Sequence, residues 1–255
     1  YEIADRDWSS DVCSSDRTRT VVLIGAGRMG KLIAEALPAS GFELLGTYDV
    51  TSATELDVAA PAAELAIDFS NKASLPHTLA YARRTGAALL SGTTGFSDEE
   101  LARIRALGTR VPVVWSANYS LGVAVLRRLA AEAAKALPSF DVEIVETHHN
   151  QKVDAPSGTA KLLLAAVDPS GEARVTYGRE GMVGVRPEHE IGMHSLRGGS
   201  VSGTHELHFF GTDEELCLTH RATSRQIFVS GAIAAARRLL MRPAGYYSFD
   251  ELMLG

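Results

Sequence analysis

The sequence predicts an α/β protein in which a doubly wound, Rossmann-type parallel sheet is joined to a second α+β domain with a mixed or antiparallel sheet. Three observations lead to this prediction. Short apolar, β-branched runs alternate with helical stretches from residue 20 to about residue 137. A Gly-x-Gly-x-x-Gly pattern joins the first of these strands to the first helix. From residue 173 to residue 223, strand-like runs separated by glycine turns replace the alternation.

The composition bounds the possible partners and location of the chain. Its 255 residues suffice for one large or two modest domains, and 45% hydrophobic with 22% charged residues is ordinary for a soluble protein. A net charge of −6 argues against nucleic acid, because phosphate binding needs a basic face. No apolar run approaches the roughly 20 residues that span a bilayer, so no membrane partner is expected. The two cysteines form no disulfide framework, which favours a cytoplasmic location.

Changes in pattern along the chain predict the domain boundaries. Residues 1–17 are polar and lack the basic and apolar regions of a signal peptide, so they are interpreted as a disordered tail or a foreign extension. Residues 18–118 and 228–255 are predicted to form the dinucleotide-binding domain, with the last long helix packing back on it. Residues 119–227 are predicted to form the substrate-binding domain.

The glycine pattern has the context of a dinucleotide-binding motif. A strand over residues 20–24 leads into Gly25-Ala-Gly-Arg-Met-Gly30, a helix follows, and a strand over residues 42–48 ends at Asp49. Asp49 lies 19 residues after Gly30, close to the spacing of about 20 expected for an acid that binds the adenosine ribose hydroxyls. Its carboxylate would repel a 2′-phosphate, and no Lys or Arg lies between Val50 and Asn71. We therefore expect NADH to be preferred over NADPH, although Arg28 could soften that preference.

Further strands over residues 65–69, 87–90 and 111–115 extend the predicted parallel sheet. The fourth strand ends in Ser91-Gly-Thr-Thr-Gly95, and the fifth is followed by Ser116-Ala-Asn-Tyr119. Because a doubly wound fold binds ligands at the carboxyl ends of its strands, the small residues of the first of these loops are candidates for cofactor contact.

The stretch from Glu146 to Ala160 concentrates reactive side chains before a helix start. Neighbouring histidines on an extended backbone point to opposite sides, so His148 and His149 are not expected to share a metal ion, and no metal site is predicted. His205, His208 and His220 lie in strand-like segments and are interpreted as structural. A histidine and a lysine can exchange protons, and the first amides of the helix at Gly158 and Thr159 can bind a carboxylate.

These residues resemble a known signature. Glu146-x-His-His-x-x-Lys152-x-Asp154-Ala-Pro-Ser-Gly-Thr-Ala160 is similar to the signature of the 4-hydroxy-tetrahydrodipicolinate reductase family, also called dihydrodipicolinate reductases. The resemblance covers nearly the whole chain from Val21 on. It also includes Ile67–Ser70, Ser91–Gly95, Ala117–Ser120, Gly178–Gly181, Arg197–Gly199 and Thr219–Arg225. Tyr119 stands where Phe is common in that family.

The resemblance implies a function and a set of site residues. It implies NAD(P)H-dependent reduction of a cyclic imine dicarboxylate to tetrahydrodipicolinate in lysine and diaminopimelate biosynthesis. His148 would be the catalytic acid/base and Lys152 the proton donor, while His149, Gly158 and Thr159 would bind the substrate carboxylate. The cofactor would contact Gly25, Gly27, Arg28, Met29, Gly30, Asp49, Gly92, Thr93, Thr94, Ser116, Ala117, Asn118 and Tyr119. The family also implies a homotetramer assembled through the C-terminal sheets, which assigns oligomerisation to residues 119–227.

Two other functions fit parts of the sequence. Another two-domain NAD-dependent dehydrogenase, acting on an amino acid or a semialdehyde, would explain the glycine loop and Asp49 but not the whole block from His148 to Thr159. A non-catalytic NAD-sensing protein would be expected to have lost its proton-transfer groups, and here His148 and Lys152 are both present.

Overall fold

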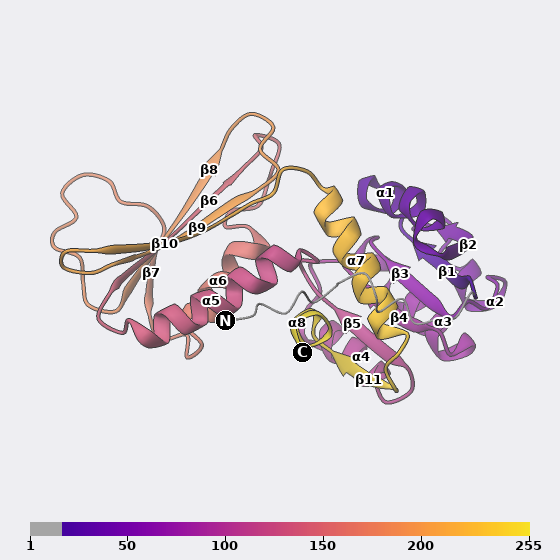
Figure 1. The fold of residues 1–255 in the computed structure, drawn as a ribbon. Helices are drawn as coiled ribbons and strands as arrows, with labels where there is room; N and C mark the ends of the chain where they lie inside the picture. The colour runs from indigo at the N-terminus through magenta and orange to yellow at the C-terminus, as the bar shows by residue number, and fades with distance from the viewer. Residues whose placement is uncertain (1–16) are drawn as a thin grey trace, which may run out of the picture.

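The computed structural model describes residues 17–255 and divides them between two sheets that lie side by side (Figure 1). Apart from Arg17, the predicted N-terminal extension lies outside the described residues. Within the described part of the chain, no helix is both long enough and apolar enough to cross a membrane.

The first sheet is parallel throughout and has the strand order β11-β5-β4-β3-β1-β2. Its strands are β1 (Arg19–Ile24), β2 (Phe42–Tyr48), β3 (Leu65–Asp68), β4 (Ala88–Ser91), β5 (Pro112–Trp115) and β11 (Gly245–Tyr247). Every residue of β3 and β4 is buried, as expected for central strands that helices cover on both faces. Strands β2 and β3 lie on opposite sides of β1, so the direction in which successive strands are added to the sheet reverses at β1. Dinucleotide-binding sheets show the same reversal of strand order.

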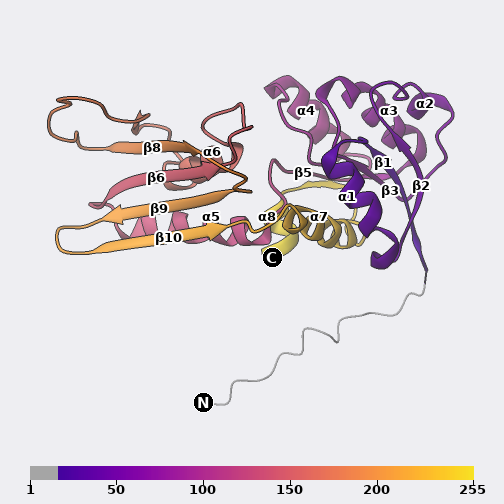
Figure 2. The same cartoon turned by 90° about the horizontal axis from the view of Figure 1, so that it is seen from above.

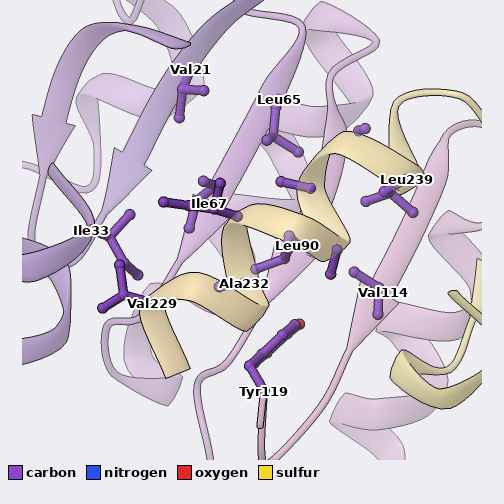
Figure 3. Packing of buried hydrophobic residues seen from close by; sticks show 14 of the residues in the cluster. Val21, Ile33, Leu65, Ile67, Leu90, Val114, Tyr119, Val229, Ala232 and Leu239 are labelled. Atoms are coloured by element: carbon purple, nitrogen blue, oxygen red, sulfur yellow. The ribbon is translucent and has the colours of Figure 1, made fainter. Parts of the chain in front are cut away.

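Helices cover both faces of this sheet and form two cores. They are α1 (Arg28–Ala36), α2 (Glu55–Val58), α3 (Leu75–Thr85), α4 (Asp98–Leu107), α7 (Gln226–Leu239) and α8 (Phe249–Leu254), with short 3₁₀ turns at Pro38–Ser40 and Lys72–Ser74. On one face, α7 lays Val229, Ala232 and Leu239 over Ile67 and Leu90 of the sheet (Figure 3). The opposite core holds residues from α2, α3 and α4. The chain thus returns to its first sheet after completing the second.

The second sheet is mixed and has the order β10-β9-β6-β8-β7. Its strands are β6 (Asp141–His148), β7 (Arg174–Thr176), β8 (Glu190–Arg197), β9 (Thr204–Phe210) and β10 (Glu215–Arg221). Strands β6, β7 and β8 are mutually parallel, whereas β9 runs antiparallel to β6 and β10. The two sheets together confirm the predicted fold class.

Helices cover only one face of the second sheet within residues 17–255. They are α5 (Leu121–Ala136) and α6 (Gly158–Val167), which lie on the same side of the sheet (Figure 2). They pack on Ile144, Leu207 and Phe209. Helix α5 begins just after β5 ends, so it runs from the carboxyl edge of the first sheet to the core of the second. This connection places the end of β6 beside the ligand-binding edge of the parallel sheet.

Candidate active site

The glycine loop between β1 and α1 is shaped by two of its three glycines. Gly25 has φ +115°, and a Cβ there would lie 2.3 Å from the carbonyl oxygen of Phe69. A Cβ on Gly30 would lie 1.9 Å from the carbonyl oxygen of Gly25, so the turn can close onto the helix only when residue 30 is glycine. A Cβ on Gly27 would meet nothing within 4 Å, so this residue leaves open space for a ligand. Gly27 also provides no side-chain cap for α1, which leaves first-turn amides to bind a phosphate.

Asp49 lies beside this loop, at the end of β2. Its Oδ1 accepts hydrogen bonds from the backbone amide and the hydroxyl of Thr51, at 2.8 and 2.6 Å. Both bonds lower the pKa of the Asp49 carboxyl, and the bond from the Thr51 hydroxyl has the larger effect. Its Oδ2 has no hydrogen-bond partner among residues 17–255. The carboxylate is therefore ionised and has one oxygen available for ribose hydroxyls.

A buried carboxylate that sequence reasoning did not assign to the site supports the loop after β4. Asp68 is 1% exposed and accepts hydrogen bonds from the hydroxyls of Ser91 and Thr93, at 2.8 and 2.9 Å. Burial raises the pKa of Asp68. Thr93 therefore points inward, so only the loop backbone and the exposed Thr94 are placed to meet a cofactor. The sequence contains a pattern that could have indicated this contact: an acid ends one buried strand, and hydroxyl residues lie at the end of the next strand.

Tyr119 also lies beneath the carboxyl edge of the parallel sheet, where the cofactor is predicted to bind and which is called the cofactor edge below. Its side chain is 1% exposed and packs between the rings of Phe69 and Phe249, at centroid distances of 5.6 and 5.2 Å. Its hydroxyl donates to the carbonyl oxygen of Ser91 over 2.8 Å. The side chain thus holds β5 against β4, and only the main chain at Tyr119 remains for a cofactor to contact.

Asn118 joins the cofactor edge to the second sheet. Its Nδ2 donates to Oγ1 of Thr159 over 2.7 Å, while its Oδ1 accepts from the backbone amide of Ser120 over 2.8 Å. Thr159 and Gly158 are the first residues of α6, which Ser157 caps by accepting from the amide of Ala160. The amides of Gly158 and Thr159 have no hydrogen-bond partner within the part of the chain that is described. Two predicted sites far apart in sequence are therefore in direct contact.

His148 is the last residue of β6, and its side chain is 12% exposed. Its Nδ1 is hydrogen-bonded to a carboxylate oxygen of Glu146. Its Nε2 lies beside the backbone of Gly203, where a Cβ would come within 3.0 Å of it, and forms no hydrogen bond to any of residues 17–255. Burial lowers the pKa of His148, and the bond to Glu146 opposes that effect. A mostly neutral imidazole whose Nε2 has no hydrogen-bond partner among the described residues is suited to exchanging protons near neutral pH.

Lys152 and His149 lie in the turn that follows β6. The amide of Lys152 donates to the carbonyl oxygen of His149 over 3.2 Å, so the two residues share one turn. The Lys152 ammonium is 2.7 Å from Oδ1 of Asp154, and its side chain is 19% exposed. The amide of His149 donates to Val201, which ties this turn to the loop after β8. The five residues predicted for proton transfer and carboxylate binding therefore lie at the end of β6, on the turn that follows it or at the start of α6.

A second buried carboxylate holds this cluster together, and the sequence did not reveal its role. Glu146 is fully buried, and it accepts both arms of the Arg197 guanidinium, at 3.0 and 2.8 Å. Burial is the largest single influence and would raise the pKa of Glu146, but hydrogen bonds from Arg197, Ser195 and His148 together outweigh it and hold the pKa at about 2. His205, interpreted from sequence as structural, lies 3.1 Å from Oγ of Ser157 and is kept neutral because burial lowers its pKa to about 4.

One group of side chains elsewhere could accept a cation. His208, Glu215 and Cys217 bring ligand atoms within 4.8 Å of one another on the exposed β9–β10 hairpin. They lie on the face of the sheet opposite to His148, because His208 and His205 are an odd number of residues apart on one strand. The absence of a metal from the catalytic site stays a prediction.

Comparison with known proteins gives one consistent family. Models described as dihydrodipicolinate reductase, N-terminus and C-terminus, match residues 19–119 and 122–253. The 4-hydroxy-tetrahydrodipicolinate reductase of Akkermansia muciniphila is 43% identical over 234 residues, which cover 89% of this chain and 94% of that protein. The protein of that name from Exiguobacterium sp. is 39% identical over 236 residues, with 91% and 94% covered.

Solved structures share the fold at lower sequence identity. A dipicolinate-bound dihydrodipicolinate reductase from Paenisporosarcina sp. TG-14 aligns with a TM-score of 0.72 and 22% identity, over 91% of this chain and 97% of that one. A scyllo-inositol dehydrogenase from Lactobacillus casei, with bound NAD(H), aligns at 0.53 and 11% identity, over 92% and 93%. The second match shows that the two-domain build also occurs among other dehydrogenases.

Proposed function

The chain belongs to the dihydrodipicolinate reductase family, and on that premise we propose that it reduces 4-hydroxy-tetrahydrodipicolinate to tetrahydrodipicolinate with NADH or NADPH. The observation that best supports this function within the fold is the hydrogen bond from Asn118 to Thr159. It brings the cofactor edge of the parallel sheet against the free amides of α6 and the acid–base groups of β6. A hydride donor and a dicarboxylate acceptor could therefore meet at one place.

Each part of this site has a distinct chemical task in the proposed reaction. The nicotinamide cofactor supplies the hydride. The glycine loop and Asp49 would bind the cofactor. The amides of Gly158 and Thr159, together with His149, bind a substrate carboxylate at the positive end of the α6 dipole. His148 exchanges a proton through Nε2, since Nδ1 is bonded to Glu146. Lys152 donates a proton to the ring, and the 4-hydroxyl group of the substrate leaves as water, so that one NADH or NADPH and one proton are consumed for each water released.

The function can be tested by following NADH oxidation with aspartate semialdehyde, pyruvate and the upstream synthase, which together generate the unstable substrate. We expect turnover that depends on the synthase. Folded protein that binds NADH without any turnover would instead favour the non-catalytic NAD-sensing alternative. Turnover with another amino acid or semialdehyde alone would favour the other dehydrogenase class.

We expect Asp49 to make NADH the better cofactor. Its ionised carboxylate would attract ribose hydroxyls and repel a 2′-phosphate, so replacing it with serine should raise the NADPH-to-NADH ratio of kcat/KM by about tenfold or more. The measurement is the ratio of the two kcat/KM values. The matched change Asp213→Ser, on the exposed β9–β10 turn, should leave the ratio unchanged. A wild-type enzyme that clearly prefers NADPH would contradict this assignment.

We also propose that the chain forms a homotetramer through the second sheet. The helix-free face of that sheet exposes Leu196 and Phe210, at 49% and 40%. The loop before β8 exposes Met182 and Val185 almost completely. Exposed apolar groups of this size are typical of surfaces that another chain covers. The cytoplasmic location stays a prediction.

Placing a charge on this surface should weaken the assembly. We expect the double change Leu196→Glu with Val185→Asp to shift a tetramer towards smaller species, as measured by sedimentation velocity at micromolar concentration. Met241, which is 74% exposed beyond the end of α7, is the matched control, and Met241→Asp should leave the mass unchanged. A monomeric wild-type protein, or a charged variant that remains tetrameric, would contradict the proposal.

A further inference from the structure

The buried carboxylate of Glu146 lies at the centre of four groups that come from different elements. It contacts His148 on its own strand, Arg197 at the end of β8 and the amide of Ser157 at the cap of α6. Pairing with β9 places His205 opposite Glu146. A carboxylate with no solvent exposure needs several donors to remain charged, and here it has them.

Strand geometry explains why these groups meet. Glu146 and His148 are two residues apart on β6, so both side chains point to the face that α5 and α6 cover. In the parallel pairing with β8, Arg197 is the register partner of His148, which puts its guanidinium beside both side chains. The fork then reaches both oxygens of Glu146, and Nη2 also donates to the carbonyl oxygen of Asp154 over 2.7 Å.

We propose that Glu146 is a positioning residue that fixes the tautomer and orientation of His148, while the two hydrogen bonds from Arg197 hold the Glu146 carboxylate in place. An ionised carboxylate can only accept, so the imidazole must carry its proton on Nδ1. Nε2 is then an acceptor in the neutral ring and a donor in the charged one, and it is the ring nitrogen that has no hydrogen-bond partner among the described residues. The inference deepens the proposed function, because it assigns what makes His148 competent for proton exchange.

The remaining neighbours of His148 are consistent with a ring held in one orientation. The His205 ring lies edge-on at a centroid distance of 5.2 Å and is neutral, so it packs without adding charge. Lys152 and Arg197 are the cations near the ring, and both lower the pKa of His148, whereas Glu146 raises it. Removing the anion and removing a cation should therefore move this pKa in opposite directions.

The test measures the pKa of His148 by hydrogen–deuterium exchange at the histidine C2 position. Mass spectrometry of the fragmented peptide separates His148 from His149, and the measurement needs neither substrate nor turnover. We expect Glu146→Gln to lower the pKa of His148 and Arg197→Gln to raise it. Glu64→Gln is the matched control, because Glu64 also accepts hydrogen bonds from an arginine and a backbone amide. Glu64 directly precedes β3, so it lies at the amino-terminal edge of the first sheet, away from the carboxyl ends of the strands. Glu64→Gln should leave the pKa of His148 unchanged.

Kinetics provide the second measurement. Glu146→Gln should lower kcat by about 10²-fold, the cost typical of a misplaced reacting group, with the Kd for NADH within about twofold of wild type. A His148 pKa that is unchanged in Glu146→Gln, or that moves the same way in both variants or in the control, overturns the proposal. If Glu146→Gln does not fold, Arg197→Gln alone decides, because a raised pKa supports the proposal and an unchanged one refutes it. A wild-type protein without reductase turnover would refute the proposed function but leave the pKa test intact.

Discussion

Replacing His148 with glutamine should lower kcat by about 10² to 10⁴-fold, the usual cost of losing one proton-transfer group. Glutamine can still bond Glu146 but cannot exchange a proton. The Kd for NADH, measured by fluorescence titration, should stay near the wild-type value, because the loops predicted to bind the cofactor lie on the other sheet. His77→Gln is the matched control, since His77 also pairs with a carboxylate, at 2.8 Å from Asp57, but lies on α3.

Lys152, the proposed proton donor on the turn after β6, can be tested by the same measurements of kcat and of the Kd for NADH. Lys152→Ala should also lower kcat strongly and leave NADH binding intact, since its ammonium forms its hydrogen bond and ion pair with Asp154 and neither of these with a described residue of the first sheet. If both His148→Gln and Lys152→Ala turned over at the wild-type rate, neither residue would belong to the mechanism. If both instead lost NADH binding, the site would extend further onto the first sheet than we propose.

Replacing Gly30 with alanine should disrupt both the first domain and its cofactor site. The new Cβ would lie 1.9 Å from the carbonyl oxygen of Gly25, so α1 must move away from β1. We expect the free energy of unfolding to fall by about 2 kcal/mol or more, as overpacking against rigid backbone does. The Kd for NADH should rise at least about tenfold. Urea denaturation and fluorescence titration measure the two effects.

Gly27→Ala separates the contribution of the glycine loop to stability from its proposed role in binding the cofactor. A Cβ at Gly27 meets no protein atom within 4 Å, and its φ of −75° suits alanine, so stability should stay within about 0.5 kcal/mol of wild type. The same Cβ would point into the space assigned to the pyrophosphate and should still weaken NADH binding. Equal losses of stability in Gly27→Ala and Gly30→Ala would contradict this division, as would unchanged NADH affinity in Gly27→Ala.

Local patterns were sufficient to predict most of the parallel sheet. Its strands read as short apolar runs because both faces are buried, and its loops follow from glycines and caps such as Ser97 and Ser120. The three-residue strand β11 and the short helix α8 were not predicted, because such short segments carry little periodicity of their own. They depend on neighbours that the chain reaches only after finishing the second sheet.

By itself, the sequence determined where the candidate residues for the chemistry are: residue type and spacing single out the glycine loop, Asp49, and the histidine and lysine block, and their roles stay predictions. Only the tertiary structure decided what holds those groups in place. The contacts of Asp68 with Thr93 and of Glu146 with Arg197 join residues that are 25 and 51 positions apart in sequence. A carboxylate in a sequence looks the same whether it is exposed or buried, and it acts as a support only when folding removes its water and supplies its donors.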